Sequence, residues 1–196
     1  MKIAVFVSGN GSNLQVIIDS IERRILKQVK IQFVIADRVC HGIERAKKHQ
    51  IHSHQFLRKD KALFQQIDGL LDSEVDLIVL AGFLSIIPTT FCQKWKNKII
   101  NLHPSLLPKY GGVGMYGDRV HRAVLDHNEK ESGATVHFVT GEVDQGEIIL
   151  QKSCEVDEGE TVESLKKKIQ KIEHIIIVEA INVLAKNRTM NKHLKA

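Results

Sequence analysis

The sequence contains few cysteines, and those it has are far apart. There are three, Cys40, Cys92 and Cys154, with no C-x-x-C spacing between them. This pattern argues against a disulfide framework and a zinc site, and it fits a reducing cytosol. Long apolar runs are also missing, because Ile3–Val7 is too short for a membrane span or a signal-peptide core. We therefore expect a cytoplasmic protein without membrane contacts.

The sequence has no large excess of charge of either sign. Its 28 basic and 23 acidic residues leave a formal net charge of +5. Lysines cluster at Lys166–Lys168 and from Lys186 to Lys195, but no aromatic residues interleave them. They predict solvated helix surface and a frayed terminus rather than nucleic-acid binding. The mild positive excess suits small anionic ligands, and 196 residues, 43% of them hydrophobic, suit one globular domain.

Apolar, β-branched segments alternate with helical patterns along the first half of the chain. Expected strands are Lys2–Val7, Lys30–Ala36, His52–Phe56, Asp76–Ala81 and Lys98–Leu102. Expected helices run from Leu14 to Ile25 with Ser12 or Asn13 as the cap, near Ile43–His49, and from Leu63 to Leu71. This alternation predicts a doubly wound, mostly parallel α/β sheet, with ligands bound beyond the carboxyl ends of its strands.

The second half of the chain changes character. Lys109–Gly117 is rich in glycine and predicts a mobile loop, and a helix is expected at His121–Asp126. Ala134–Val139 and Ile148–Val156 indicate a hairpin of two strands. The expected fold class is thus α/β with an antiparallel C-terminal portion and a long final helix over Val162–Ala185.

A glycine turn, Ser8-Gly-Asn-Gly-Ser-Asn13, joins the first strand to the first helix. Glycines let a backbone approach an anion closely, and the free N–H groups and dipole of a helix start favour a phosphate. The turn lacks the Lys-Ser/Thr ending of a P-loop and the full G-x-G-x-x-G spacing, so ATP hydrolysis and dinucleotide binding are not indicated. A tight turn with a capped helix and no ligand is the alternative interpretation.

Asn101-Leu-His-Pro104 lies at the end of an expected buried strand. Residues two apart share one face of a strand, so Asn101 and His103 can point into one cleft. An asparagine amide can donate to a developing oxyanion, and a histidine can carry a proton near neutral pH. Asp144, in a loop between two expected strands, can orient the histidine. A purely structural role is the alternative for each residue, and Asp144 alone suits a turn.

Taken together, four segments resemble the phosphoribosylglycinamide formyltransferases. They are Ser8–Leu14, Leu80–Phe83, Asn101–Tyr110 and Gly133–Val139 running on to Asp144, and the likeness covers about residues 1–185. The string Asn-x-His-Pro-Ser-Leu-Leu-Pro is specific to formyltransferases and hydrolases that use formyltetrahydrofolate. The resemblance implies a single Rossmann-like formyltransferase domain over 1–196. It divides this domain into a phosphate-binding half at 1–100, a catalytic and folate-binding half at 101–185, and a tail at 186–196.

The resemblance also implies a reaction of de novo purine biosynthesis, on the route to IMP. The donor is 10-formyltetrahydrofolate, the acceptor is the amine of N1-(5-phospho-D-ribosyl)glycinamide, and no metal takes part. The implied catalytic residues are Asn101, His103 and Asp144, and the implied acceptor residues are Gly11, Ser12, Asn13, Gln170 and Glu173. The implied folate residues are Lys61, Phe83, Leu84, Ser85, Ile86, Ile87, Asn101, Thr140, Gly141, Glu142, Val143 and Asp144. A cis bond between Leu107 and Pro108 is also implied.

Some positions depart from the family pattern. Ser85 stands where many relatives carry a basic residue, and Lys61 stands near the place of an arginine that meets the folate glutamate tail. The loop 109–117, with the apolar Val113, is longer than in many members. These departures bear on folate affinity and loop closure rather than on the class of reaction.

Two other functions share these motifs. A formyltetrahydrofolate hydrolase would use the same three residues with water as the acceptor, but such enzymes usually carry a regulatory domain before the first strand. A non-catalytic binder of phosphoribosyl ligands is expected to lose one of the three residues. The expected partners are small-molecule substrates, without nucleic acid or membrane, in a monomer or homodimer. His49, His52 and His54 are expected to be surface histidines rather than metal ligands.

Overall fold

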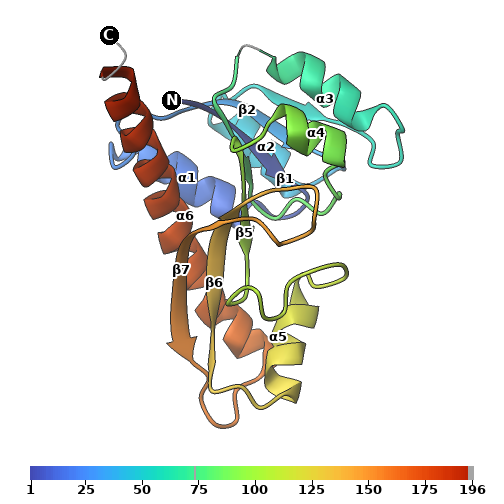
Figure 1. The fold of residues 1–196 in the computed structure, drawn as a ribbon, viewed down its shortest axis with the longest axis vertical. Helices are drawn as coiled ribbons and strands as arrows, with labels where there is room; N and C mark the ends of the chain where they lie inside the picture. The colour runs from blue at the N-terminus through green and yellow to red at the C-terminus, as the bar shows by residue number, and fades with distance from the viewer. Residues whose placement is uncertain (73, 194–196) are drawn as a thin grey trace.

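The fold is a seven-stranded sheet covered by helices on both faces (Figure 1). The structure is a computed structural model that describes residues 1–72 and 74–193, with side chains described as far as Met190. The strands in this part of the chain are β1 (Lys2–Val7), β2 (Lys30–Ala36), β3 (Ser53–Gln55), β4 (Leu77–Leu80), β5 (Ile99–His103), β6 (Glu131–Phe138) and β7 (Ile148–Glu155). Their order is β3-β2-β1-β4-β5-β6-β7, with β1 to β5 parallel and β6 and β7 antiparallel. The predicted fold class is confirmed.

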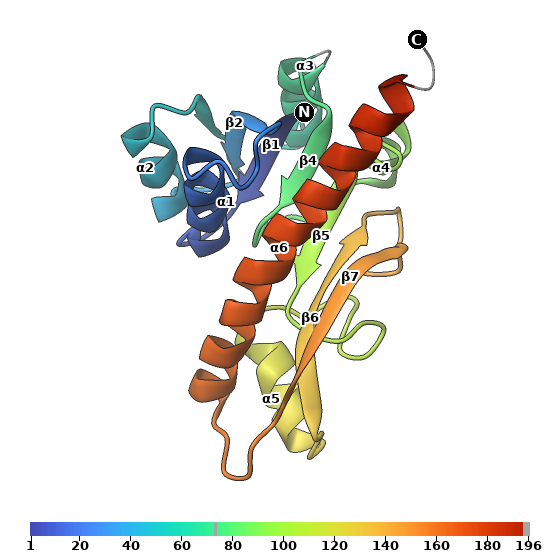
Figure 2. The same ribbon diagram turned by 90° about the vertical axis from the view of Figure 1, so that its left-hand side faces the viewer.

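The helices form two layers. They are α1 (Ser12–Glu22), α2 (His41–Lys48), α3 (Leu63–Leu71), α4 (Thr89–Lys94), α5 (Asp118–Asp126) and α6 (Val162–His193). One hydrophobic core packs α1, α2, α5 and α6 on one face of the sheet, and a second core packs α3 and α4 on the other. Figure 2 shows α6 running diagonally across the sheet, past both α1 and α5. None of the described helices is long and apolar enough to cross a membrane.

The buried strand β1 shows why both faces are covered. After Lys2 its residues are apolar without alternation, because successive side chains enter opposite cores. Ile3, Val5 and Val7 pack into the core under α1 and α6, whereas Ala4 and Phe6 pack into the core under α3. All five are completely buried. Such a strand is stable only in the interior of a sheet covered by helices on both sides.

The strand order reverses between β1 and β4, since β2 lies on one side of β1 and β4 on the other. Loops that leave neighbouring strands at such a switch point diverge and leave a crevice for ligands. The Ser8 amide donates to the Gly82 carbonyl at 3.0 Å, which holds the loops after β1 and β4 together. β5 ends next to β4, at His103. The loops after Val7, Leu80 and His103 therefore share one edge of the sheet.

Two predictions about α1 are wrong. The helix ends at Glu22, so Ile25 lies outside it and is exposed. The cap is Gly11, at φ +73° and without a side-chain hydrogen bond, while Ser12 and Asn13 belong to the first turn. Glycine adopts this left-handed conformation without the steric cost that a side chain brings. The two side chains are therefore free to face other elements.

One helix, α4, was not predicted, and the final helix is longer than predicted. α4 was not predicted, because its six residues are too few to show a helical period. α6 was predicted to end at Ala185 but continues to His193, so the chain does not fray at Lys186. Its last turns are held by tertiary contacts, with Arg188 bonded to Asp76 at 2.6 Å and Thr189 to Gln28 at 2.8 Å.

Candidate active site

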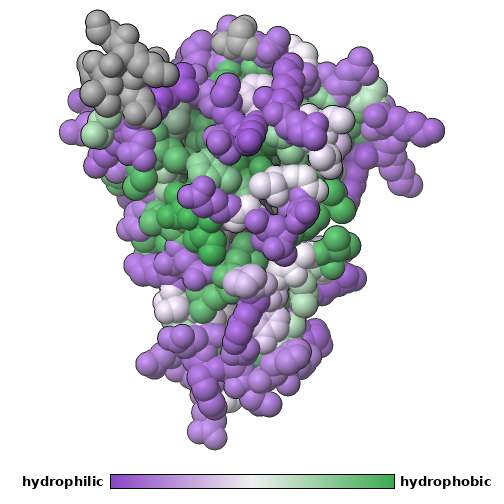
Figure 3. Space-filling model, in the orientation of Figure 1, coloured by the Kyte–Doolittle hydropathy of each residue, from purple (hydrophilic) through white to green (hydrophobic). Residues whose placement is uncertain are grey.

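A cavity of about 570 Å³ opens at the carboxyl edge of the sheet. Its wall is formed by the loop after β4, the ends of β5 and β6, the loop 112–117, the loop 139–144, and one side of α6. Figure 3 shows apolar side chains gathered around the middle of the molecule, between its more polar ends. This volume and this mixed lining are typical of a site for a small molecule.

The three predicted catalytic side chains meet in this cavity. Nδ1 of His103 lies 3.5 Å from Oδ2 of Asp144, and Nδ2 of Asn101 lies 3.4 Å from Oδ1 of the same carboxylate. Asp144 is at φ +56°, and its Oδ2 also accepts a bond of 2.9 Å from the Gly112 amide. One carboxylate thus links the end of β5 to the glycine-rich loop. Asn101, His103 and Asp144 all line the same cavity, so the three side chains converge as expected from the sequence.

The position of the proton on His103 follows from its other ring nitrogen. Nε2 lies 2.8 Å from the Tyr110 carbonyl, which can only accept, so Nε2 carries a hydrogen. In the neutral ring Nδ1 then presents its lone pair toward Asp144. Burial lowers the pKa of His103 below its ordinary value of 6.5, and it outweighs the opposing influence of the Asp144 charge and the Tyr110 carbonyl. The resting imidazole at pH 7 is therefore neutral and can take up a proton at Nδ1.

His137 belongs to this cluster and was not identified from the sequence. It pairs with Asn101 across β5 and β6, and its Nε2 lies 3.1 Å from Nδ2 of Asn101. Its Nδ1 donates to the Phe138 carbonyl at 2.8 Å, so Nε2 of the neutral ring is an acceptor for the Asn101 amide. His137 also lies 3.6 Å from Asp144. The sequence placed His137 in a strand, but only the antiparallel register brings it to Asn101.

The charge of Asp144 is stabilised from several sides. Burial raises its pKa, but the neighbouring imidazoles of His137 and His103, which favour the charged carboxylate, outweigh burial and hold the pKa below its ordinary value. The Gly112 amide acts in the same direction. Asp144 is therefore ionised at neutral pH and can stabilise an imidazolium when His103 takes up a proton.

A second group of predicted residues lies where α6 passes the start of α1. Gln170 donates to Ser12 Oγ at 3.1 Å, and Asn13 donates to Glu173 at 3.5 Å. Burial raises the pKa of Glu173 to about 7, although the Asn13 bond opposes this shift. Among the described residues, Asn13 Oδ1 and His121 Nδ1 are buried side-chain atoms without a hydrogen-bond partner. Asn13 and His121 line the cavity, so this end is suited to a polar ligand.

The predicted folate residues divide into two groups. Those that line the cavity are Phe83, Leu84, Ser85, Ile86, Ile87, Asn101, Thr140, Gly141, Val143 and Asp144. Lys61 and Glu142 are exposed and lie outside the wall, as do Gly11 and Ser12 of the acceptor set. Arg58, which the sequence interpretation did not select, does line the cavity, and its Nη2 donates to the Leu84 carbonyl at 2.6 Å.

A completely buried carboxylate, Asp37, organises this side of the cavity. Ser85 donates to it at 2.6 Å, and the guanidinium of Arg38 lies 3.1 Å away. Burial raises the pKa of Asp37, but the bonds from Arg38, Ser85 and Ser8 together hold the pKa below its ordinary value. The hydroxyl of Ser8 in turn accepts from the Leu84 amide at 2.8 Å. Asp37 thus ties the glycine turn to the loop after β4.

The three histidines expected at the surface, at 49, 52 and 54, do not share a common site, because His49 and His54 contact different residues. His49 lies 2.7 Å from Glu22, and the ring of His54 lies 5.9 Å from that of Phe33. Within the part of the chain that the structure describes, no group of three or more histidine, cysteine or acidic side chains is placed to hold a metal ion.

Comparison with known proteins identifies the family. The formyl transferase model matches residues 1–181. The chain belongs to the formyl transferase family. A "Phosphoribosylglycinamide formyltransferase" of Escherichia coli is 35% identical to it over 197 residues, which are 96% of this chain and 89% of that protein. A "Trifunctional purine biosynthetic protein adenosine-3" of Chironomus tentans is 40% identical over 94% of this chain, but this formyl transferase spans only 14% of that relative's length.

The fold of this formyl transferase is also that of solved relatives. A crystal structure of phosphoribosylglycinamide formyltransferase from Anaplasma phagocytophilum matches it with a TM-score of 0.87 and 32% identity. The match covers 95% of this chain and 88% of the other. The likeness includes the antiparallel C-terminal strands as well as the parallel half.

Proposed function

We propose that this formyl transferase moves the formyl group of 10-formyltetrahydrofolate to the amine of N1-(5-phospho-D-ribosyl)glycinamide. The products are N-formylglycinamide ribonucleotide and tetrahydrofolate, in the synthesis of IMP. The observation that carries the proposal is the meeting of Asn101, His103 and Asp144 in one cavity. The names of the relatives support the choice of substrates.

The acceptor is proposed to lie between α1 and α6. Gly11, Ser12 and Asn13 begin α1, where free backbone N–H groups and the helix dipole favour the phosphate. Gln170 is bonded to Ser12 and can reach the same anion. Glu173, half protonated at neutral pH, can donate to or accept from a ribose hydroxyl. These residues would hold the acceptor with its amine toward the end of β5.

The reaction requires one proton to move. The unprotonated amine attacks the formyl carbon, and the carbonyl oxygen becomes an oxyanion. Neutral His103 accepts the proton of the attacking nitrogen at Nδ1, where Asp144 stabilises the imidazolium. The proton then passes to the folate nitrogen as its bond to carbon breaks. A new carbon–nitrogen bond replaces the old one, and His103 returns to its neutral form.

Asn101 is proposed to stabilise the oxyanion by donating an amide hydrogen. In this structure its Nδ2 faces His137 at 3.1 Å and Asp144 at 3.4 Å. The longer bond is the weaker one, so the hydrogen toward Asp144 is the one available to turn to the substrate oxygen. His137 then keeps the amide in the required orientation.

The folate is proposed to lie along the apolar wall of Phe83, Ile86 and Ile87, with the loop 140–144 opposite. Arg58 offers a positive charge at this wall and is better placed than Lys61 for a carboxylate of the folate tail. We propose small molecules as the partners, a cytoplasmic location and a monomer or homodimer, with no metal in the reaction. The widely spaced cysteines support the location.

One assay tests the proposal. The purified protein is incubated with 10-formyltetrahydrofolate, and tetrahydrofolate release is followed with and without the ribonucleotide acceptor. Release that depends on the acceptor, with formation of the formylated product, is expected. Equal release without the acceptor would indicate a hydrolase, and ligand binding without turnover would indicate a non-catalytic binder.

A further inference from the structure

Arg45 of α2 lies beside the glycine turn and bonds to it from outside the cavity. The half-buried guanidinium donates from Nε to the Asn10 carbonyl at 2.7 Å and from Nη2 to the Asn10 side chain at 3.2 Å. Nη1 donates to the Gln15 side chain at 3.1 Å. All three hydrogen-bond acceptors are uncharged oxygens, so these bonds do not neutralise the positive charge of Arg45.

These bonds fix the direction of a peptide group. In a trans peptide the carbonyl of one residue and the N–H of the next point in opposite directions. Since Arg45 holds the Asn10 carbonyl toward α2, the Gly11 N–H points away from α2. The neighbouring peptide is held in the same way, because the Gly42 amide donates to the Gly9 carbonyl at 3.1 Å. Gly42 and Arg45 of α2 therefore set the orientation of the glycine turn.

The close approach of the two segments is specific to glycine. A Cβ atom on Gly11 would lie 2.9 Å from the Cα of Gly42 and 3.4 Å from the Arg45 side chain. Gly11 also has φ +73°, which a larger residue rarely adopts. On the side of α2, the turn is thus packed closely against Gly42 and Arg45. The Gly11 N–H points to the other side of the turn, away from α2.

We propose that Arg45 is a positioning residue that aims the Gly11 amide at the phosphate of the acceptor. This inference rests on the proposed function, in which that phosphate binds at the start of α1. Arg45 does not touch the phosphate. It orients a donor that does, and its unneutralised charge adds to the positive potential at the helix start. The recognised group is a phosphate monoester, and an acceptor without that group has no use for Arg45.

The test compares two acceptors in three variants. Arg45→Met removes the hydrogen bonds and the charge. Arg45→Lys keeps the charge and can still donate one hydrogen bond to the turn. Lys48→Met, which removes an exposed lysine of the same helix, is the control. KM and kcat are measured with the ribonucleotide acceptor and with the same glycinamide riboside lacking the phosphate. Thermal unfolding checks that each variant is folded.

Arg45→Met is expected to raise KM for the phosphorylated acceptor about ten- to hundredfold, with little change in kcat or in KM for the folate. Arg45→Lys recovers part of this loss, and Lys48→Met behaves as the wild type. Turnover of the riboside is unchanged in all variants. An unchanged KM, or equal losses with both acceptors, would overturn the role of Arg45. If the wild-type protein transfers no formyl group, or does not distinguish the two acceptors, the proposed function itself fails.

Discussion

The pKa of Glu173 reports directly on the electrostatics of the proposed acceptor site. Its carboxyl group faces the cavity from α6, and burial raises its pKa to about 7 from an ordinary value of 4.5. The unfolded chain releases this proton near pH 4.5, whereas the folded protein keeps it until about pH 7. The folded state therefore binds more protons between these values, and the free energy of unfolding falls as pH rises through this window.

The size of the effect follows from the two pKa values. At full strength their difference corresponds to roughly 3 kcal/mol, and most of it is lost between pH 5 and pH 8. The carboxyl group lies at the wall of an open cavity, so water screens part of it. We therefore expect the wild type to lose roughly 2 kcal/mol of stability through Glu173 between pH 5 and pH 8. Glu173→Gln keeps the shape and the hydrogen-bonding capacity of the neutral acid but does not titrate, so it removes only this contribution.

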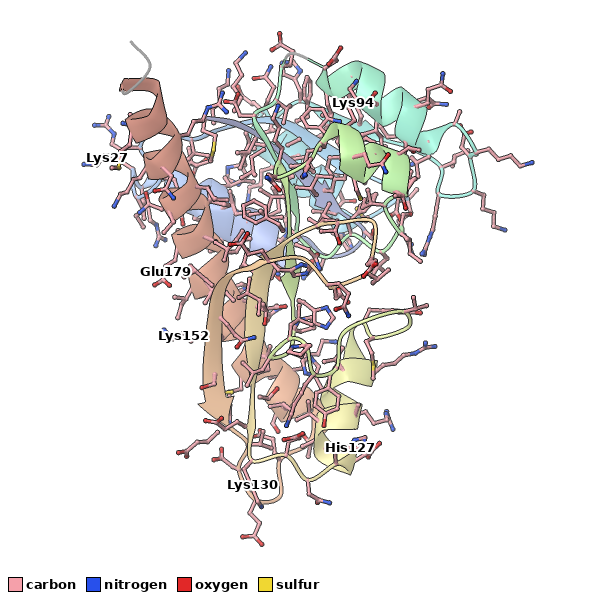
Figure 4. The ribbon with its side chains drawn as sticks, in the orientation of Figure 1. Lys27, Lys94, His127, Lys130, Lys152 and Glu179 are labelled. Atoms are coloured by element: carbon pink, nitrogen blue, oxygen red, sulfur yellow. The ribbon has the colours of Figure 1, made fainter. Side chains whose placement is uncertain are left out.

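The assay is urea unfolding of the wild type and Glu173→Gln at pH 5 and pH 8. Groups that titrate in both proteins cancel in the difference between them. Glu173→Gln should gain roughly 2 kcal/mol of stability relative to the wild type on going from pH 5 to pH 8. Glu179→Gln is the control, because Glu179 lies on the same helix and points outward into solvent (Figure 4). A difference between wild type and Glu173→Gln that is the same at both pH values would refute the reasoning.

Three further predictions concern the proposed catalytic residues and the backbone. Asn101→Ala and His103→Ala should fold normally but lose roughly a hundred- to thousandfold in kcat, and near-normal turnover by either would contradict the mechanism. Because the reacting form of His103 is neutral and burial holds its pKa below the ordinary value, kcat/KM should fall only when the pH drops below that lowered pKa. A rate that rises on acidification would exclude this role. Gly146→Ala would place a Cβ 1.7 Å from the Phe138 carbonyl oxygen and should lower the free energy of unfolding, measured with urea, by about 3 kcal/mol. Gly69 lies in α3 with open space around it, so Gly69→Ala should raise the free energy of unfolding by up to about 1 kcal/mol.

The parts of the site that follow from local sequence were predictable. Asn101 and His103 are two apart at the end of a buried strand, and the strand period alone places them on one face. The glycine turn and its position before α1 also follow from neighbouring residues. The doubly wound fold could be predicted because its strands and helices alternate with clear periods.

The parts that depend on pairing between distant segments were not predictable. His137 reaches Asn101 only through the register of β5 and β6, which no local pattern encodes. Arg58, rather than Lys61, lines the cavity because of the path of the chain between β3 and α3. The cap of α1 was misjudged because Ser12 and Asn13 are good capping residues, yet both turn toward α6, where Gln170 and Glu173 meet them.

The 32 residues of α6 make it roughly 48 Å long. It packs against α1 from the first half of the chain and against α5, β6 and β7 from the second half. A continuous helix with these contacts ties the two halves of the described chain together and resists bending between them. The cavity is open at the carboxyl edge of the sheet, so reactants can enter there directly, past the glycine-rich loop that Gly112 ties to Asp144. Exchange of reactants and products is then expected to need local rearrangement of side chains and loops at the cavity rim, not rotation of one half of the sheet against the other.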